Sequence, residues 1–243
     1  MVTARIFRYD PSTDREARFD VFEVEPHHGM SVLDLLFEVL QRHDPGVSFR
    51  CSCRVGMCGT CGMLINNGER LACQTKVAAL GDDIEIKPLN HMPVIKDLAI
   101  DMSPFFAKYR AVEPNFRDPI DEGILELLPD RGDLLNVGDS CISCGLCVSA
   151  CTMTAVDPDF VGPAALYRAL TLIEDRREQR ATDRLNDAVI GEHGAWRCHG
   201  HMDCIKVCPK GLPLTESIQK IKRLAAKRAL TGTLRDFGRR RPA

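Results

Sequence analysis

The sequence has neither a long apolar run nor an excess of one charge. No stretch approaches the roughly 18 uninterrupted apolar residues that a transmembrane helix requires, and the first residues lack the charged and then apolar layout of a secretion signal. The 32 basic residues nearly balance 34 acidic ones, so the overall charge gives no reason to expect a nucleic-acid partner. We therefore expect a chain that does not span a membrane by itself, is not exported by the usual route and binds no nucleic acid.

Cysteine, in contrast, is abundant: the chain has 12 among its 243 residues. In the reducing environment expected for a chain without a secretion signal, thiols rarely form disulfides, and clustered cysteines are usually metal ligands. The cysteines fall into an N-terminal and a C-terminal group, separated by 67 residues without any. This grouping predicts two domains, over residues 1–102 and 103–243.

The first hundred residues alternate between apolar and polar as strands do, with one helix between them. Ser31 followed by Asp34 is a capping-box pattern, which predicts that a helix begins after Ser31. The expected elements are a hairpin around residues 4–6 and 19–21, a helix that ends at residues 44–46, and strands at 63–65, 71–76 and 84–86. This order suits a small β-grasp domain.

Beyond about residue 100 the apolar spacing becomes helical and prolines punctuate the chain. Pro104, Pro114, Pro119 and Pro129 predict a linker with short helical pieces. Helices are expected after Gly162 and after Pro213. The charged run 174–178 is interpreted as a solvated helix face or a subunit interface. The fold class expected for the whole chain is therefore α+β.

The N-terminal cysteines have the plant-type 2Fe-2S ferredoxin spacing, C-x4-C-x2-C with a fourth cysteine after eleven residues. The predicted ligands are Cys53, Cys58, Cys61 and Cys73. Gly56, Gly59 and Gly62 would let the backbone close around a cluster and direct N–H groups at its sulfurs. Buried or zinc-bound cysteines are the alternative, and Cys51 is predicted to be a bystander.

The C-terminal cysteines form a bacterial-type ferredoxin run and a second, incomplete copy. In such proteins the fourth cysteine of each run ligates the other cluster. The first predicted set is therefore complete: Cys141, Cys144, Cys147 and Cys208 for a 4Fe-4S cluster. The second contains only three thiols: Cys151, Cys198 and Cys204. Three thiolates favour a 3Fe-4S cluster, and the alternative is a 4Fe-4S cluster with His201, which replaces the missing cysteine, as fourth ligand.

On these motifs the sequence resembles the iron-sulfur subunits of succinate dehydrogenase and fumarate reductase. The segments that carry the resemblance are Ser52–Cys61, Leu71–Cys73, the Cys141 run, Asp157–Pro163, Asp175–Arg176, Arg197–His199 and Val207–Gly211. The resemblance implies an N-terminal β-grasp plant-type 2Fe-2S ferredoxin domain followed by an α-helical bacterial-type ferredoxin domain. It also implies electron transfer between an FAD-containing flavoprotein, which interconverts succinate and fumarate, and a membrane quinone, through 2Fe-2S, 4Fe-4S and 3Fe-4S clusters.

The resemblance further implies a membrane anchor as partner, with haem b left open, and a peripheral position on the cytoplasmic side of the cell membrane. Ubiquinone-using members have proline after the cysteine equivalent to Cys151 and a tryptophan pair nearby. This chain has Thr152–Val156 there, and its single tryptophan is Trp196, which favours a menaquinone-type partner. His199, within the family's Arg-Cys-His segment, and His201 are candidates for the quinone vicinity, and no catalytic residue is expected on this chain.

Two other interpretations stay open at this point. One is the cluster subunit of a thiol-linked fumarate reductase, although such chains carry an added cysteine-rich domain that this sequence does not show. The other is a non-catalytic iron-sulfur binding or sensor protein. Three different cluster motifs in one chain favour a graded electron path over structural metal sites. The direction of electron flow is not fixed by the sequence.

Overall fold

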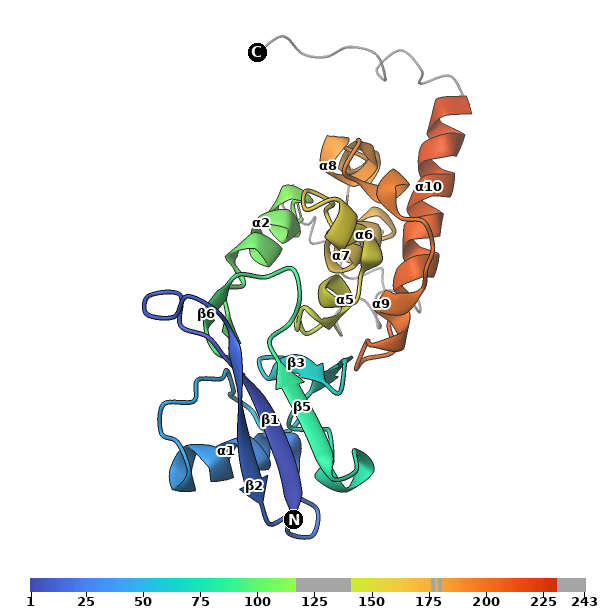
Figure 1. The fold of residues 1–243 in the computed structure, drawn as a ribbon. Coiled ribbons are helices and arrows are strands. Elements are labelled where there is room, and N and C mark those ends of the chain that lie inside the picture. Colours follow the sequence, from blue (N-terminus) through green and yellow to red (C-terminus); the bar gives the residue numbers. More distant parts are fainter. Residues whose placement is uncertain (117–140, 176–177, 179–180, 231–243) are drawn as a thin grey trace. The chain divides into compact units, whose positions relative to one another are not determined.

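The structure is a computed structural model that describes residues 1–116, 141–175, 178 and 181–230 (Figure 1). Two compact units are present, and neither is one continuous stretch of chain. The first contains residues 1–106, 141–151 and 206–211, and the second contains the described residues of 107–116, 152–205 and 212–230. Pro119 and Pro129 of the expected linker lie outside the described residues.

A mixed five-stranded sheet in the order β2-β1-β5-β3-β4 is the base of the first unit (Figure 1). Its strands are β1 (Val2–Arg8), β2 (Arg18–Val24), β3 (Gly62–Ile65), β4 (Gly68–Leu71) and β5 (Asp83–Lys87). β1 runs parallel to β5 and antiparallel to β2, while β3 is antiparallel to both β4 and β5. Alternate residues such as Ala4 and Ile6 are fully buried. This arrangement confirms the predicted β-grasp fold and the α+β class.

Helix α1 (Val32–Arg42) begins as the capping box predicts. The backbone N–H of Asp34 donates to the Ser31 hydroxyl over 3.2 Å, and the N–H of Ser31 donates to the Asp34 carboxylate over 2.9 Å. Apolar residues at helical spacing, among them Leu35, Leu36 and Val39, are fully buried. Each cap of this kind contributes on the order of 1 kcal/mol, so the sequence determines where this helix starts.

The prediction of a strand at residues 71–76 is wrong, because the strand found here is β4, which starts at Gly68 and ends at Leu71. Asn66 and Asn67 both adopt positive φ, 48° and 60°, and such a two-residue turn places Gly68 directly opposite Ile65. After Leu71 the chain turns instead of extending, with the N–H groups of Gln74 and Thr75 both donating to the Leu71 carbonyl. Cys73 therefore lies in a turn at the end of the hairpin.

Short elements complete the first unit. They are η1 (Val77–Ala79), the two-stranded sheet of β6 (Val94–Lys96) and β7 (Ala99–Ile100), and α5 (Leu146–Ser149). Helix α2 (Ser103–Ala111) follows β7 and confirms a helical piece in the expected linker.

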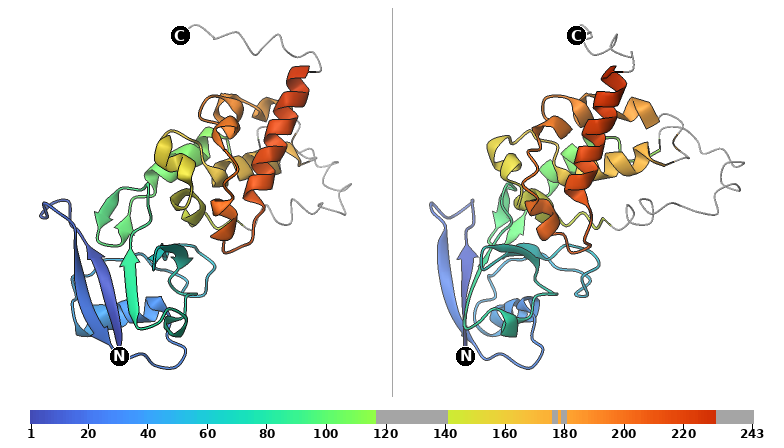
Figure 2. Two further views of the ribbon diagram at one scale, coloured as in Figure 1. Left: turned by 45° about the vertical axis from the view of Figure 1, so that its right-hand side comes forward. Right: turned by 90° about the vertical axis from the view of Figure 1, so that its right-hand side faces the viewer.

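The second unit is helical, as the sequence predicts. Its elements are α6 (Thr152–Val156), α7 (Pro163–Ile173), η2 (Ala181–Arg184), α8 (Asp187–Ile190), η3 (Ala195–Arg197), α9 (Asp203–Lys206) and α10 (Leu214–Leu230). α7 forms the core, where Leu166, Tyr167 and Leu170 are fully buried, and α10 packs alongside it (Figure 2). Both helices begin where Pro163 and Pro213 predict.

The interpretation of residues 174–178 as a solvated helix face is wrong for Asp175 and Glu178, which are both buried. Glu178 pairs with Arg184, whose Nε donates to it over 2.7 Å, and the Arg184 side chain is fully buried. Arg184 also donates to the carbonyl of Glu113 over 2.5 Å. Glu178 and Arg184 therefore form an ion pair inside the second unit and do not face solvent. Arg176 and Arg177 lie outside the described residues.

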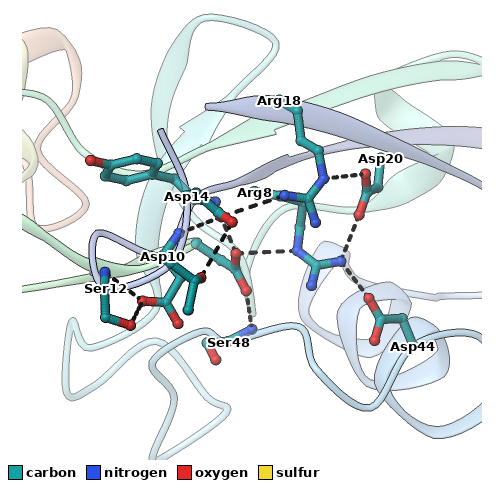
Figure 3. A network of polar contacts seen from close by, with 11 residues as sticks. Arg8, Asp10, Ser12, Asp14, Arg18, Asp20, Asp44 and Ser48 are labelled. Atoms are coloured by element: carbon teal, nitrogen blue, oxygen red, sulfur yellow. Dashed lines mark hydrogen bonds and ion pairs between the residues drawn. The ribbon is translucent and has the colours of Figure 1, made fainter. Parts of the chain in front are cut away.

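A buried arginine, Arg8 at the end of β1, links distant parts of the first unit (Figure 3). Its Nε donates to Asp97 over 3.1 Å and its Nη1 to Asp20 over 2.8 Å and to Asp44. Asp97 also accepts the backbone N–H groups of Tyr9 and Ser48, each over 3.0 Å. Burial opposes the charge of Arg8, but the hydrogen bond to Asp44 and the attraction of Asp97 outweigh it and raise the pKa of the guanidinium.

Arg8→Met is expected to destabilise the first unit by about 3–5 kcal/mol, because the buried Asp97 carboxylate would lose its partner. Arg18→Ala is the matched control, since Arg18 is half exposed and pairs with Asp14 and Asp20, and exposed pairs contribute about 0–1 kcal/mol. Chemical denaturation followed by circular dichroism measures both. Equal effects of the two substitutions would show that the Arg8 network is not a main support of the unit.

Candidate metal centres

The loop that carries Cys53, Cys58 and Cys61 is held in place by aromatic and backbone contacts within the first unit. The rings of Phe37, on α1, and Phe49 meet edge to face with centroids 5.2 Å apart. The Arg54 guanidinium lies 4.4 Å from the centroid of the Phe37 ring, a cation–π distance. Both ends of the loop are thus fixed, one against α1 and the other at β3, which starts directly after Cys61.

The segment that carries Cys73 is attached to the start of α1. The N–H groups of Val32 and Leu33, which have no partner within the helix, donate to the carbonyls of Thr75 and Ala72 over 2.9 and 3.1 Å. The N–H of Ala72 donates to the Cys61 carbonyl over 3.0 Å. Cys73 is therefore positioned beside Cys61, although eleven residues separate them in the sequence.

Backbone N–H groups in the loop point at cysteine sulfur. Cys53 Sγ accepts from the N–H of Met57 over 3.3 Å and from that of Cys58 over 3.2 Å. Gly56 and Gly59 have φ of 77° and 71°, a left-handed conformation that only glycine adopts without strain. These features are the environment predicted for a 2Fe-2S cluster, whose sulfurs are stabilised by such donors.

The thiols of this set differ in how readily they lose a proton. A hydrogen bond from the Thr60 side chain, aided by the N–H groups of Cys53 and Thr60, lowers the pKa of Cys58 to about 6. Burial, with smaller contributions from the nearby Cys73 and Cys58 sulfurs, raises the pKa of Cys61 to about 12. Cys61 therefore keeps its proton at neutral pH unless a metal ion displaces it. Converging thiols, N–H donors and left-handed glycines fit a cluster with four thiolate ligands.

The second set, Cys141, Cys144, Cys147 and Cys208, also lies within the first unit. Cys147 is in α5, which is preceded by Gly145 with φ of 82°, and Cys208 comes from the segment after α9. Burial raises the pKa of Cys144 to about 11, and the nearby sulfurs of Cys141 and Cys208 contribute in the same direction. The fold therefore brings Cys208 within electrostatic range of a run more than sixty residues earlier. These donors fit a cubane cluster.

The two ligand segments touch at Gly59, which is buried. A Cβ added to Gly59 would lie 2.6 Å from the Cβ of Cys144 and 2.9 Å from its Cα. Because carbon atoms in contact are normally 3.5–4.0 Å apart, no side chain fits at this position. The backbone of the first ligand loop thus lies directly against a ligand of the second set.

The third set is divided between the units: Cys151 belongs to the first, and Cys198 and Cys204 belong to the second. Their joint ligation of one cluster stays a prediction. Helix α10 supports both cysteines of the second unit. The Lys222 ammonium donates to the Cys198 carbonyl over 2.6 Å, and the Thr215 hydroxyl lies 3.4 Å from Cys204 Sγ.

Asp157 fixes the segment that leads to Cys198. This buried carboxylate accepts from His193 Nδ1 over 2.9 Å, from Arg197 Nε over 2.6 Å, and from the N–H of Asp159. The hydrogen bonds from His193 and Arg197 lower the pKa of Asp157 to about 2. The hydrogen bond between His193 and Asp157 in turn raises the pKa of His193. Arg197 immediately precedes Cys198, so Asp157 restrains a predicted ligand through its neighbour.

The quinone candidates His199 and His201 are both exposed, in the loop between η3 and α9. Their rings are nearly parallel, with centroids 6.3 Å apart. Sequence reasoning did not single out Thr60, Gln74 or Lys222. Gln74 Nε2 lies 3.8 Å from Cys73 Sγ, as a sulfur hydrogen bond requires. Thr60 and Gln74 adjoin ligands in the sequence, whereas nothing in the sequence links Lys222 to Cys198.

Comparison with protein families supports the two cluster types. Residues 3–107 match the family described as "2Fe-2S iron-sulfur cluster binding domain". Residues 138–212 match the family described as "4Fe-4S dicluster domain".

Curated relatives match along almost the whole chain. A fumarate reductase iron-sulfur subunit from Mycobacterium tuberculosis is 37% identical over 242 residues, which are 98% of this chain and 98% of that protein. The chain belongs to the iron-sulfur subunits of succinate dehydrogenase and fumarate reductase. The succinate dehydrogenase iron-sulfur subunit of Paracoccus denitrificans is 36% identical, covering 92% of this chain and 87% of that protein.

Solved structures agree with this assignment. A chain of the "Mycobacterium smegmatis Sdh1 complex in the apo form" superposes with a TM-score of 0.83 at 26% identity, covering 94% of this subunit and 97% of that chain. Among the helices that the structure describes here, none has the length and apolar character needed to cross a membrane. As a subunit of these oxidoreductases, the chain serves in electron transfer.

Asp157→Asn is expected to lower the thermal midpoint of the subunit and its iron content, because Arg197 and His193 lose a charged partner. The pKa of His193 is raised from 6.5, so its contribution to stability is present below that pH and is lost as the pH rises through the raised value. Thermal unfolding from mildly acidic to mildly alkaline pH should show this loss in the wild-type protein and not in the variant. Asp183→Asn, at an exposed position in η2, is the control, and an unchanged pH profile in Asp157→Asn would contradict the assignment.

Proposed function

We propose that this subunit relays electrons between an FAD-containing flavoprotein and a membrane quinone through 2Fe-2S, 4Fe-4S and 3Fe-4S clusters. Each cluster, when bound, supplies one-electron oxidation and reduction, while succinate and fumarate react on the flavoprotein. The contribution of this chain is to hold the clusters, to exclude water and to adjust their potentials through hydrogen bonds to sulfur. Divided by cluster type, the chain has one domain at residues 1–102 and a second at 103–243.

One observation carries the proposal: a single compact unit holds two sets of four cysteines, and their backbones meet at Gly59 and Cys144. Two metal sites that only stabilised the fold would not need to lie next to each other. The relatives match over nearly their full lengths and are named as subunits of the two enzymes, which favours this function over a thiol-linked system or a sensor.

The third centre is proposed as a 3Fe-4S cluster held by Cys151, Cys198 and Cys204. The description of the matched family as a dicluster domain supports a second cluster in the C-terminal part. Three thiolates leave one corner of a cubane without a ligand, which favours loss of its iron. The exposed His201 is the competing fourth ligand.

The proposed partners are the flavoprotein and a membrane anchor, with the subunit attached peripherally on the cytoplasmic side of the membrane. A menaquinone-type quinone is supported by Thr152–Val156, which lacks the proline and tryptophans of ubiquinone-using members. His199 and His201, exposed near Cys198, are proposed for the quinone vicinity. Haem content depends on the anchor.

Cys204→Ser is expected to damage the third centre first, because it removes one of three thiolates. Quinone reduction by the complex should be lost, while succinate should still reduce an artificial dye that accepts electrons from the flavoprotein. Cys51→Ser is the control, since Cys51 is predicted to ligate nothing. Loss of dye reduction with quinone reduction intact would refute the ligand assignment.

His201→Cys is expected to complete the second cysteine run and so to bind a fourth iron at the third centre. Low-temperature electron paramagnetic resonance (EPR) spectroscopy of the oxidised complex should then lose the three-iron signal, and the iron content should rise. His199→Cys, which is outside the run's spacing, is the control. A wild-type complex with two four-iron clusters and no three-iron signal would instead support His201, or an external group, as the fourth ligand.

A further inference from the structure

The contact at Gly59 is between backbones and not between flexible side chains. A Cβ on Gly59 would lie 2.6 and 2.9 Å from the Cβ and Cα of Cys144, and 3.1 Å from the carbonyl oxygen of Ile142. The Ile142–Cys144 segment could not avoid the added atom by a rotamer change, because two of the three nearest atoms belong to its main chain. A methyl group at position 59 would have to move that whole segment away.

Neighbouring contacts hold the same two segments together. A Cβ on Gly62, at the start of β3, would lie 3.2 Å from the Cys144 carbonyl oxygen and 3.1 Å from Leu146 Cδ2. At the other end of α5, the Ser149 hydroxyl accepts from the N–H of Asn90 over 3.0 Å and donates to Glu69 over 3.1 Å. The segment around Cys144 is therefore attached on both sides to the part of the first unit that contains the five-stranded sheet. Gly59 is the point at which this segment and the first ligand loop come closest.

We propose that Gly59 is a positioning residue for electron transfer: its lack of a side chain keeps the two ligand loops in van der Waals contact. This inference rests on the proposed ligand sets. In the direction of succinate oxidation, one electron leaves the centre of the first set, which is oxidised, and reduces the centre of the second set. The partner flavin supplies the electron, and no bond forms or breaks. Because electron tunnelling weakens steeply with distance, separating the loops slows this step.

The rival explanation for a glycine here is its backbone conformation alone, since φ is 71°. Gly29 and Gly81 share that conformation, with φ of 78° and 83°, but a Cβ at either position would meet nothing within 4 Å. Alanine at these two positions therefore introduces the same backbone strain without separating any segments. Gly62 offers the reverse test, because its φ is not positive and alanine there presses on Cys144 and Leu146 without that strain.

The experiment compares Gly59→Ala, Gly62→Ala, Gly29→Ala and Gly81→Ala in the assembled complex with its flavoprotein and anchor. Iron and sulfide analysis with EPR first establishes that both centres are loaded. Rapid-freeze EPR after mixing with succinate then measures reduction of the second centre. A separate, activity-independent readout is the enhancement of spin relaxation of the first reduced centre by the second, which falls steeply with their separation.

We expect Gly59→Ala to slow electron transfer between the centres several-fold and to weaken their magnetic coupling, with a smaller change in the same direction for Gly62→Ala. Gly29→Ala and Gly81→Ala should leave both readouts at wild-type values while lowering thermal stability.

Wild-type rate and coupling in a fully loaded Gly59→Ala complex would overturn the inference, as would equal slowing in Gly29→Ala and Gly81→Ala. If the Gly59→Ala complex does not load its clusters, the test rests on Gly62→Ala. Unchanged magnetic coupling between the centres of the Gly62→Ala complex would then overturn the inference. Absence of either centre from the wild-type complex would instead refute the ligand sets, and with them the proposed function.

Discussion

Burial of cysteine thiols beside one another is the constraint on which the first unit depends. Burial raises the pKa of Cys61 to about 12 and that of Cys144 to about 11, so neither ionises at neutral pH without a metal. Binding of a cation and formation of the folded loops are therefore thermodynamically linked. The loops around these thiols contain left-handed glycines and N–H groups aimed at sulfur, which have little use without a bound cluster.

The two compact units show how that constraint is met in space. The β-grasp sheet supplies a rigid edge at β3 and β4, and the segments 141–151 and 206–211 pack with that unit although they belong to the C-terminal half of the chain. In the second unit, helix α10 has the same supporting role, because Lys222 and Thr215 contact the predicted ligands Cys198 and Cys204.

Local patterns were predictable, and so was one long-range association, because the spacing of the cysteine runs assigns Cys208 to the same set as Cys144. The capping box at Ser31, the helices after Pro163 and Pro213, and the left-handed Gly56 and Gly59 follow from residue chemistry within a few positions. The early start of β4 follows from the Asn66-Asn67 turn, which is a local pattern. The sequence did not indicate the burial of Glu178 or the contact of Gly59 with Cys144. These two features depend on partners six and 85 residues away, which no local pattern encodes.

The division of the units bears on how the protein is made. Cys53, Cys58, Cys61 and Cys73 all leave the ribosome with the first third of the chain, together with every strand of the β-grasp sheet except β5, which follows within fifteen residues. The first centre has its complete ligand set at that stage. The second lacks Cys208 until translation is almost finished, so the two ligand sets become complete at widely separated stages of synthesis, in the N-to-C order in which domains generally fold.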